Sequence, residues 1–210
     1  MKTLLLIGAL LLATTTANAV EWQASCNSYY KNWFGKYTFE VNKGEVGGCP
    51  TDSEKHFTGR WDWSERAEVK SREEFGYGKY EWSGTVNIDR PCKPAYRSTI
   101  VQVHGGHSTS QRPMGNPSFL ATNYVGKFRG VRNKGTLVDV PINTPFDVVA
   151  KVDFTKKYVK TSYFINGEHV LTEMDKQKTD HIFFKFGVYR VNSNCTIKQT
   201  YTKVKLKRVK

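Results

Sequence analysis

Beyond its N-terminus, the sequence lacks any segment apolar enough to insert in a lipid bilayer. The N-terminal apolar stretch from Leu4 to Ala13 is itself too short to cross a membrane. The basic Lys2 precedes it, and the small residues of Ala17-Asn18-Ala19 follow it. This order is typical of a secretory signal peptide. We therefore expect residues 1–19 to be removed and residues 20–210 to form one secreted domain, extracellular or, in a bacterium, periplasmic.

Acidic residues are scarce: 19 Asp and Glu stand against 32 Lys and Arg, which gives a net charge of +13. Lys2 is the only one of these charges in the expected signal peptide, so the secreted domain keeps about +12. Such an excess favours an anionic partner, although a basic surface without a specific partner is the simpler interpretation. For a secreted protein we expect an acidic polysaccharide rather than nucleic acid or a membrane, and a monomer without a cofactor.

Cysteines are few, and no two of them have the close Cys-x-x-Cys spacing that zinc sites favour, so we expect no metal. All four lie in the expected secreted part, where disulfides persist. Three pairings into two bridges are possible. Nearness in sequence favours Cys26 with Cys49, and Cys92 with Cys195 then follows by elimination.

No stretch of the sequence has a long helical period, and there is no internal repeat. Runs rich in Val, Ile, Thr and aromatic residues, separated by Gly, Pro and Asn, predict many short strands. These runs are 37–41, 66–71, 77–88, 99–104, 124–131, 136–140, 146–154, 158–165, 181–190 and 196–207. Asn166-Gly167 predicts a hairpin turn, and residues 108–123 are expected to form a long loop. The pattern predicts an all-β sandwich or barrel.

Three of these expected strands carry polar residues on one face. Residues two apart in a strand share a face, so polar and apolar residues that alternate point in opposite directions. The polar residues are Arg66, Glu68 and Lys70 in the first strand, Gln102 and His104 in the second, and Lys185 and Tyr189 in the third. If the three strands are neighbours, one face combines cations, an amide, an imidazole and a phenol, a set that suits an acidic sugar.

The same stretches resemble the signature strands of a known family. Arg66-x-Glu68-x-Lys70, Gln102-Val103-His104 and the run Phe-Phe-Lys-Phe-Gly-Val-Tyr at 183–189 are similar, in order and spacing, to the motifs of jelly-roll polysaccharide lyases. These are the alginate lyases of polysaccharide lyase family 7 and the related glucuronan lyases. The resemblance implies a β-jelly roll of two curved antiparallel sheets with a concave substrate cleft. It also implies cleavage of a 4-linked uronate polysaccharide by β-elimination.

The sequence also departs from the alginate-lyase pattern. Ala67 stands where the family usually has Ser or Thr, and Lys70 where it usually has a second Arg, so a point charge replaces a two-pronged guanidinium. Arg190 and Val191 follow Tyr189, where Asn and Gln are usual. Alginate and glucuronan therefore both remain possible substrates.

The resemblance assigns roles to the polar residues. Arg66 and Gln102 would neutralise the uronate carboxylate, which makes the C5 proton acidic enough to remove. Tyr189 would be the acid that protonates the departing O4, and either His104 or Tyr189 itself would be the base. The remaining candidates for substrate binding are Lys70, Lys185, Arg190 and Glu68, of which Glu68 is also expected to hold Arg66 or Lys70 in place.

Two other function classes fit a basic jelly roll. A noncatalytic protein that binds acidic polysaccharides would need no Tyr and His beside a carboxylate neutraliser. A glycoside hydrolase would need two carboxylates that flank the bond, but Glu65 and Glu68 lie an odd number of residues apart and therefore face opposite sides of the strand. The motif set favours the lyase.

Aromatic residues outside the motifs are further candidates for sugar contacts. Trp61, Trp63 and Trp82 could stack on sugar rings unless the hydrophobic core takes them, and His56 could serve as a second base.

Overall fold

The computed structural model describes nine segments of the chain. These are residues 20–25, 30–44, 65–90, 97–105, 118–122, 128–130, 142–176, 179–191 and 195–210. The described segments form strands and turns, and none of them is a helix long and apolar enough to cross a membrane.

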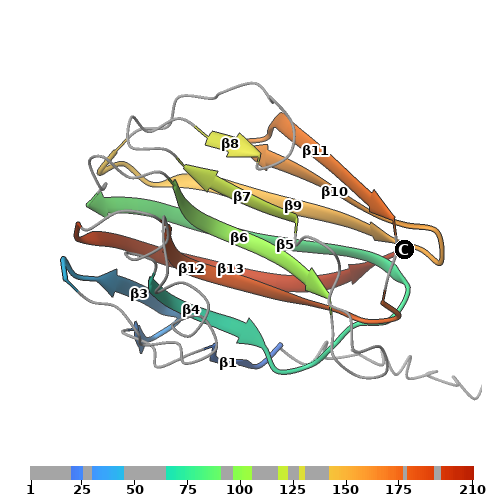
Figure 1. The fold of residues 1–210 in the computed structure, drawn as a ribbon, viewed down its shortest axis with the longest axis horizontal. Helices are drawn as coiled ribbons and strands as arrows, with labels where there is room; N and C mark the ends of the chain where they lie inside the picture. The colour runs from blue at the N-terminus through green and yellow to red at the C-terminus, as the bar shows by residue number, and fades with distance from the viewer. Residues whose placement is uncertain are drawn as a thin grey trace, which may run out of the picture.

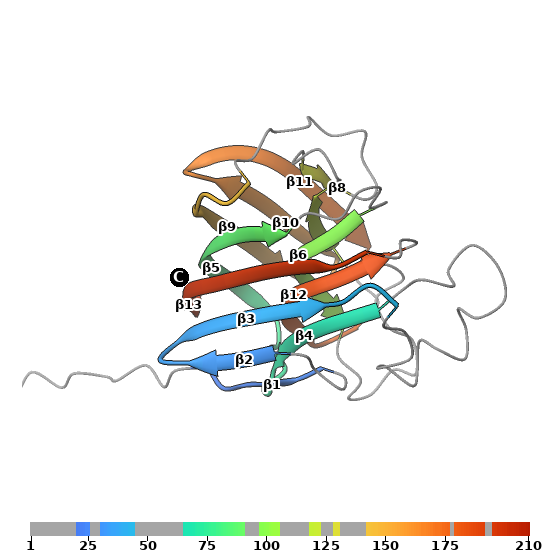
Figure 2. The same ribbon diagram turned by 90° about the vertical axis from the view of Figure 1, so that its left-hand side faces the viewer.

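The strands form two antiparallel sheets that lie face to face (Figures 1 and 2). The first sheet has six strands in the order β1-β4-β12-β6-β7-β8. Their bounds are β1 Trp22–Ala24, β4 Glu65–Ser71, β12 Ile182–Val191, β6 Arg97–Gly105, β7 Ser118–Thr122 and β8 Phe128–Gly130. Strands that are distant in sequence are therefore neighbours in this sheet.

The second sheet has seven strands in the order β11-β10-β9-β5-β13-β3-β2. Their bounds are β11 Glu168–Lys176, β10 Tyr158–Ile165, β9 Phe146–Phe154, β5 Gly78–Arg90, β13 Ile197–Val209, β3 Lys36–Val41 and β2 Tyr30–Trp33. The two-sheet arrangement fits a jelly-roll sandwich, so the predicted fold class is confirmed.

The core lies between the sheets and is rich in aromatic rings. Phe186 of β12 contacts Phe39 of β3 and Tyr201 of β13, with ring centroids 5.6 Å and 5.1 Å away. Trp82 of β5 is completely buried in the same core, 5.7 Å from Phe186. Trp82 is therefore a core residue and cannot stack on a sugar.

Two hairpins have two-residue turns with positive φ at both residues, as a type I′ turn requires. Asn166 and Gly167 join β10 to β11 with φ of 49° and 83°, which confirms the predicted hairpin. Phe34 and Gly35 join β2 to β3 with φ of 49° and 73°. The second turn was not predicted, because Phe is unusual at a position that favours Asn, Asp or Gly.

Most predicted strands are present, but four short or edge strands were missed. The predictions for 146–154 and 158–165 match β9 and β10 to the residue. Strand β7 lies within the predicted loop 108–123, so that prediction is wrong for residues 118–122. Strands β1, β2 and β11 were also missed, and all three lie at the edges of their sheets. Strand β11 is in addition rich in charged residues. The predicted strand at 136–140 lies outside the described residues.

Candidate active site

The three motif strands are direct neighbours, because β12 lies between β4 and β6. Their register brings the predicted site residues side by side. Tyr189 lies opposite Arg66, and Lys185 lies opposite Lys70 on one side and Gln102 on the other. The predicted polar face required the three motif strands to be neighbours, and in the structure they are.

The alternation along each strand separates core from site. The inward residues are completely buried between the sheets: Ala67, Val69, Val101, Val103, Phe184, Phe186 and Val188. The polar residues between them consequently lie on the outer face of the six-stranded sheet. We call the cluster of Arg66, Glu68, Gln102, Lys185 and Tyr189 on this face the polar cluster.

Glu68 is the centre of the polar cluster. Its side chain has no exposed surface, and Gln102 donates a hydrogen bond from Nε2 to Glu68 Oε1. The other oxygen, Oε2, lies 3.6 Å from an Arg66 guanidinium nitrogen and 3.8 Å from Lys185 Nζ. Glu68 therefore acts as a buried counter-ion for Arg66 and Lys185. Its burial favours a positioning role over the substrate contact considered from the sequence.

The guanidinium of Arg66 also stacks on the ring of Tyr189, with its central carbon 4.0 Å from the ring centroid. A cation in this position is attracted to the aromatic face. Because Glu68 and Tyr189 hold Arg66 from two sides, the guanidinium and the phenol are fixed relative to each other.

His104 stacks on Phe183, its cross-strand neighbour, with ring centroids 5.0 Å apart. Its Nδ1 lies 3.2 Å from the carbonyl oxygen of Gly105. A carbonyl only accepts hydrogen bonds, so Nδ1 carries the proton in this contact and a neutral ring keeps its lone pair on Nε2. In this tautomer the basic nitrogen of the imidazole is Nε2.

Phe183 also brings two cations towards the histidine. Lys70 Nζ and Lys185 Nζ lie 5.7 Å and 5.9 Å from its ring centroid. Phe183 belongs to the motif at 183–189 but was not predicted as a site residue, although it alternates with Lys185 and so shares its face. The outer face is therefore strongly cationic on both sides of Glu68.

Gly187 lies opposite Glu68 at an irregularity in β12. Between Phe186 and Arg190 the pairing with β6 shifts by one residue, and Gly187 has φ of +128°. A Cβ atom there would lie 2.4 Å from the carbonyl oxygen of Ala67, closer than real contacts allow. Only glycine fits, and a glycine inside a strand is a sequence signal that could have identified this bulge.

Tyr201 supports the bulge from the core. Its hydroxyl lies 3.3 Å from the Gly187 carbonyl oxygen, 3.0 Å from that of Ile100 and 2.6 Å from Gln199 Oε1. Burial raises the pKa of the Tyr201 phenol well above its ordinary value near 10, and the negative charge of Glu68 adds to the rise although the Gly187 hydrogen bond lowers it. Tyr201 is therefore a neutral donor that joins the two sheets.

Several predicted residues lie outside what the structure describes. They are Cys26, Cys49, Cys92, His56, Trp61, Trp63 and the side chain of Arg190. Cys195 is described, and the described residues include no free cysteine, but the pairing of the four stays a prediction. Within the described segments no group of three or more His, Cys, Asp or Glu could hold a metal ion.

Comparison with solved structures gives the fold a precedent. The alginate lyase AlgAT5 from polysaccharide lyase family 7 matches with a TM-score of 0.61 at 12% identity, over 91% of this chain and 95% of that chain. The alginate lyase from Corynebacterium sp. matches with a TM-score of 0.61 at 14% identity, over 86% and 81%. The chain has the alginate-lyase jelly-roll fold. A further match is alginate lyase AlyC3 in complex with dimannuronate, with a TM-score of 0.56 at 16% identity over 83% and 75%.

No protein-family model and no curated protein matches the sequence. At 12–16% identity the structural likeness establishes the fold. The activity depends on the chemistry of the polar cluster and of His104.

Proposed function

We propose that the chain is a secreted polysaccharide lyase that cleaves a 4-linked uronate polymer by β-elimination and leaves an unsaturated uronate end. The observation that carries the proposal is the polar cluster, in which Arg66, Gln102 and Tyr189 lie on one face around the buried Glu68. The fold shared with alginate lyases supports it.

The first requirement of the reaction is to neutralise the uronate carboxylate. Arg66 supplies a guanidinium, and Gln102 supplies an amide whose second N–H is not used by Glu68. Lys185 lies opposite Gln102 on one side and Lys70 on the other, and both lysines add positive charge beside the amide. These donors would stabilise the negative charge that develops on the carboxylate when the C5 proton leaves.

The second requirement is an acid and a base within reach of the sugar. We assign Tyr189 as the acid that gives its phenolic proton to O4. The base is His104 through Nε2, or Tyr189 itself. In mannuronate and glucuronate the C5 proton and O4 lie on the same side, so one tyrosine can serve both steps, whereas guluronate needs groups on opposite sides.

The charge and the fold support a uronate polymer as the substrate. AlyC3 is described with dimannuronate, and a family 7 alginate lyase with the product GGG, so proteins of this fold bind uronate oligomers. The positive outer face described above suits such a polyanion. We propose alginate or glucuronan as the substrate.

Export and the two disulfides belong to the same proposal. A polymer substrate too large to enter a cell requires an enzyme outside it, which agrees with the expected signal peptide at 1–19. Bridges among the four cysteines would then stabilise the secreted sandwich without taking part in the chemistry.

One observation favours the alternative, a noncatalytic protein that binds acidic polysaccharides. Only 3% of Gln102 is exposed, and its amide already donates to Glu68. If that hydrogen bond holds the amide away from the sugar, the cluster would bind a polyanion without activating it.

The decisive experiment is incubation of the purified protein with poly-mannuronate, poly-guluronate, glucuronan and a glycosaminoglycan panel. The ultraviolet absorbance of the unsaturated uronate reports elimination directly. A rise with one polymer would establish the lyase and its substrate together. Saturable binding to a polymer without any rise would overturn the lyase in favour of the binding protein.

A further inference from the structure

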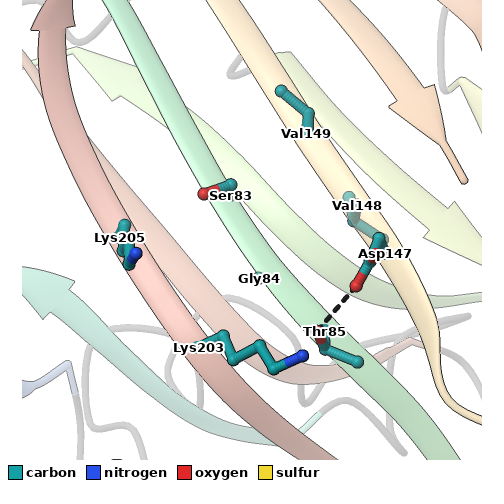
Figure 3. A pocket seen from close by; sticks show the side chains of 8 residues that line it. All are labelled: Ser83, Gly84, Thr85, Asp147, Val148, Val149, Lys203 and Lys205. Carbon is teal, nitrogen blue, oxygen red and sulfur yellow. Dashed lines mark hydrogen bonds between the residues drawn. The ribbon is translucent and has the colours of Figure 1, made fainter. Parts of the chain in front are cut away.

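The outer face of the seven-stranded sheet carries a hollow of its own (Figure 3). The polar cluster lies on the outer face of the other sheet. The volume of the hollow is about 250 Å³. It spans three neighbouring strands and is lined by Ser83, Gly84 and Thr85 of β5, Asp147, Val148 and Val149 of β9, and Lys203 and Lys205 of β13. This volume is below the roughly 300–1,000 Å³ of pockets that hold drug-sized ligands, so the hollow suits a single sugar unit.

A β-bulge in β13 aims two lysines at this hollow. The pairing with β5 shifts between Thr202 and Lys205, and Lys203 has φ of +53°. Before the bulge Gln199 and Tyr201 point inward, so simple alternation would turn Lys203 and Lys205 into the core as well. The bulge reverses the alternation and leaves both lysines exposed.

The backbone of Lys203 is strained, because a left-handed conformation is unfavourable for a residue with a Cβ atom. Strain of this kind persists where the surrounding structure enforces it, and it often marks a functional position. Bulges, too, often re-aim a side chain.

The two lysines differ from the other lysines on the same face of β13. Lys207 pairs with Glu81 at 2.9 Å, and Lys198 pairs with Glu40 at 3.9 Å. Among the described residues, neither Lys203 nor Lys205 has an ion-pair or hydrogen-bond partner. The hollow therefore has two available ammonium groups at its β13 side.

The opposite side of the hollow has the opposite charge. Asp147 is exposed on β9, and its carboxylate accepts a hydrogen bond of 2.6 Å from the Thr85 hydroxyl, as Figure 3 shows. Between the two sides lies the Ser83 hydroxyl, which has no hydrogen-bond partner among the described residues. A small inorganic anion would gain from the lysines but would be repelled by Asp147.

We propose that this hollow is a second, noncatalytic binding site for one uronate unit of an acidic polysaccharide. The uronate carboxylate lies between Lys203 and Lys205, and its ring hydroxyls donate to Asp147 and bond to Ser83. The site is independent of the lyase activity, because no residue of the polar cluster contributes to it.

The test is an NMR titration of the isotope-labelled protein with trimannuronate that has no unsaturated end. The backbone amide signals of residues 83–85 and 203–205 report binding at the hollow. We expect saturable shifts at these amides. The double variant K203Q/K205Q should lose roughly tenfold in affinity at this site, because it removes both charges that would contact the carboxylate, and tenfold corresponds to about 1.4 kcal/mol. The matched control K198Q/K207Q removes the same charge from the same face and should bind as the unmodified protein does.

Two further probes separate the alternatives. Neutral mannotriose tests the need for the carboxylate, and sodium sulfate at equal ionic strength tests a general anion site; neither should give saturable shifts. Equal saturation by sulfate, an equal loss in both double variants, or absence of shifts at residues 83–85 would each overturn the proposal. Because the readout is local, failure here leaves the lyase proposal standing, and a lyase that fails leaves this result unchanged.

Discussion

The outer faces of the two sheets use charge in opposite ways. On the six-stranded sheet, Arg66 and Lys185 both approach a Glu68 that is fully buried. On the seven-stranded sheet, charges pair singly in solvent, as Lys207 does with Glu81, where 61% and 21% of the side chains are exposed. A buried carboxylate with several partners fixes their positions, whereas an exposed pair contributes little to stability or geometry. The difference supports placing the proposed chemistry on the first face.

The largest expected effect comes from removing one hydroxyl on each face. Tyr189→Phe keeps the ring under Arg66 but deletes the proposed acid, so kcat should fall by a factor of roughly 10²–10⁴ while the polymer still binds. Tyr158→Phe deletes a hydroxyl of the other sheet, 3.1 Å from Asp153, and should leave kcat unchanged. The measurement is the rate of ultraviolet absorbance increase. A Tyr189→Phe protein with a near-normal rate would remove the assignment.

Gly187→Ala should destabilise the six-stranded sheet. The added Cβ would collide with the β4 backbone at Ala67, and φ of +128° is unfavourable for alanine. We expect a loss of about 1–3 kcal/mol in the free energy of unfolding, measured with urea. Gly76→Ala is the matched control, because its Cβ would meet nothing within 4 Å. Equal stability of the two variants would contradict the tight bulge.

Replacing one glutamate on each face compares the two charge arrangements directly. Glu68→Gln removes the buried counter-ion of Arg66 and Lys185 and should cost roughly 1–3 kcal/mol of unfolding free energy. Glu81→Gln removes the exposed partner of Lys207 and should cost less than about 1 kcal/mol. Similar losses of unfolding free energy in the two variants would contradict the role of Glu68 as a buried counter-ion.

The smallest expected effect is a pH dependence from Tyr201, which joins the two sheets. Its raised pKa means that the folded protein keeps a proton that the unfolded chain loses above about pH 10. The free energy of unfolding should therefore fall as pH rises past 10, by up to roughly 1.4 kcal/mol per pH unit from this group. Tyr201→Phe lacks this contribution, so its stability difference from the unmodified protein should narrow between pH 9 and 11.5. A constant difference would contradict the raised pKa.

The sequence predicted what depends on local alternation. The polar and apolar faces around Arg66–Lys70, Gln102–His104 and Lys185–Tyr189 follow from the period of two, and the structure places them as expected. The hydrogen bond from Gln102 to Glu68 could not be predicted. It depends on β12 lying between their two strands with no side chain at Gly187, and strand order is set by packing across the whole chain.

The same limit explains the residues that were missed. Tyr201 contacts Gly187 from the other sheet. The residues next to Tyr201 in the sequence therefore give no sign of a role beyond the core. The hollow beside Lys203 depends on a bulge, which reverses the expected alternation of β13 at one residue. The strained backbone that turns Lys203 and Lys205 outward could not be predicted from the sequence.

Strand order also has a consequence for how the protein is made. In each sheet a late strand separates two early ones: β12 lies between β4 and β6, and β13 lies between β5 and β3. An emerging chain that ends before β12 therefore lacks the strand that joins β4 to β6, and no partial product can assemble the polar cluster. Folding that relies on such distant pairings is slow. Late closure of both sheets would delay folding, which suits the export proposed above, because a protein crosses a narrow export channel before it has folded.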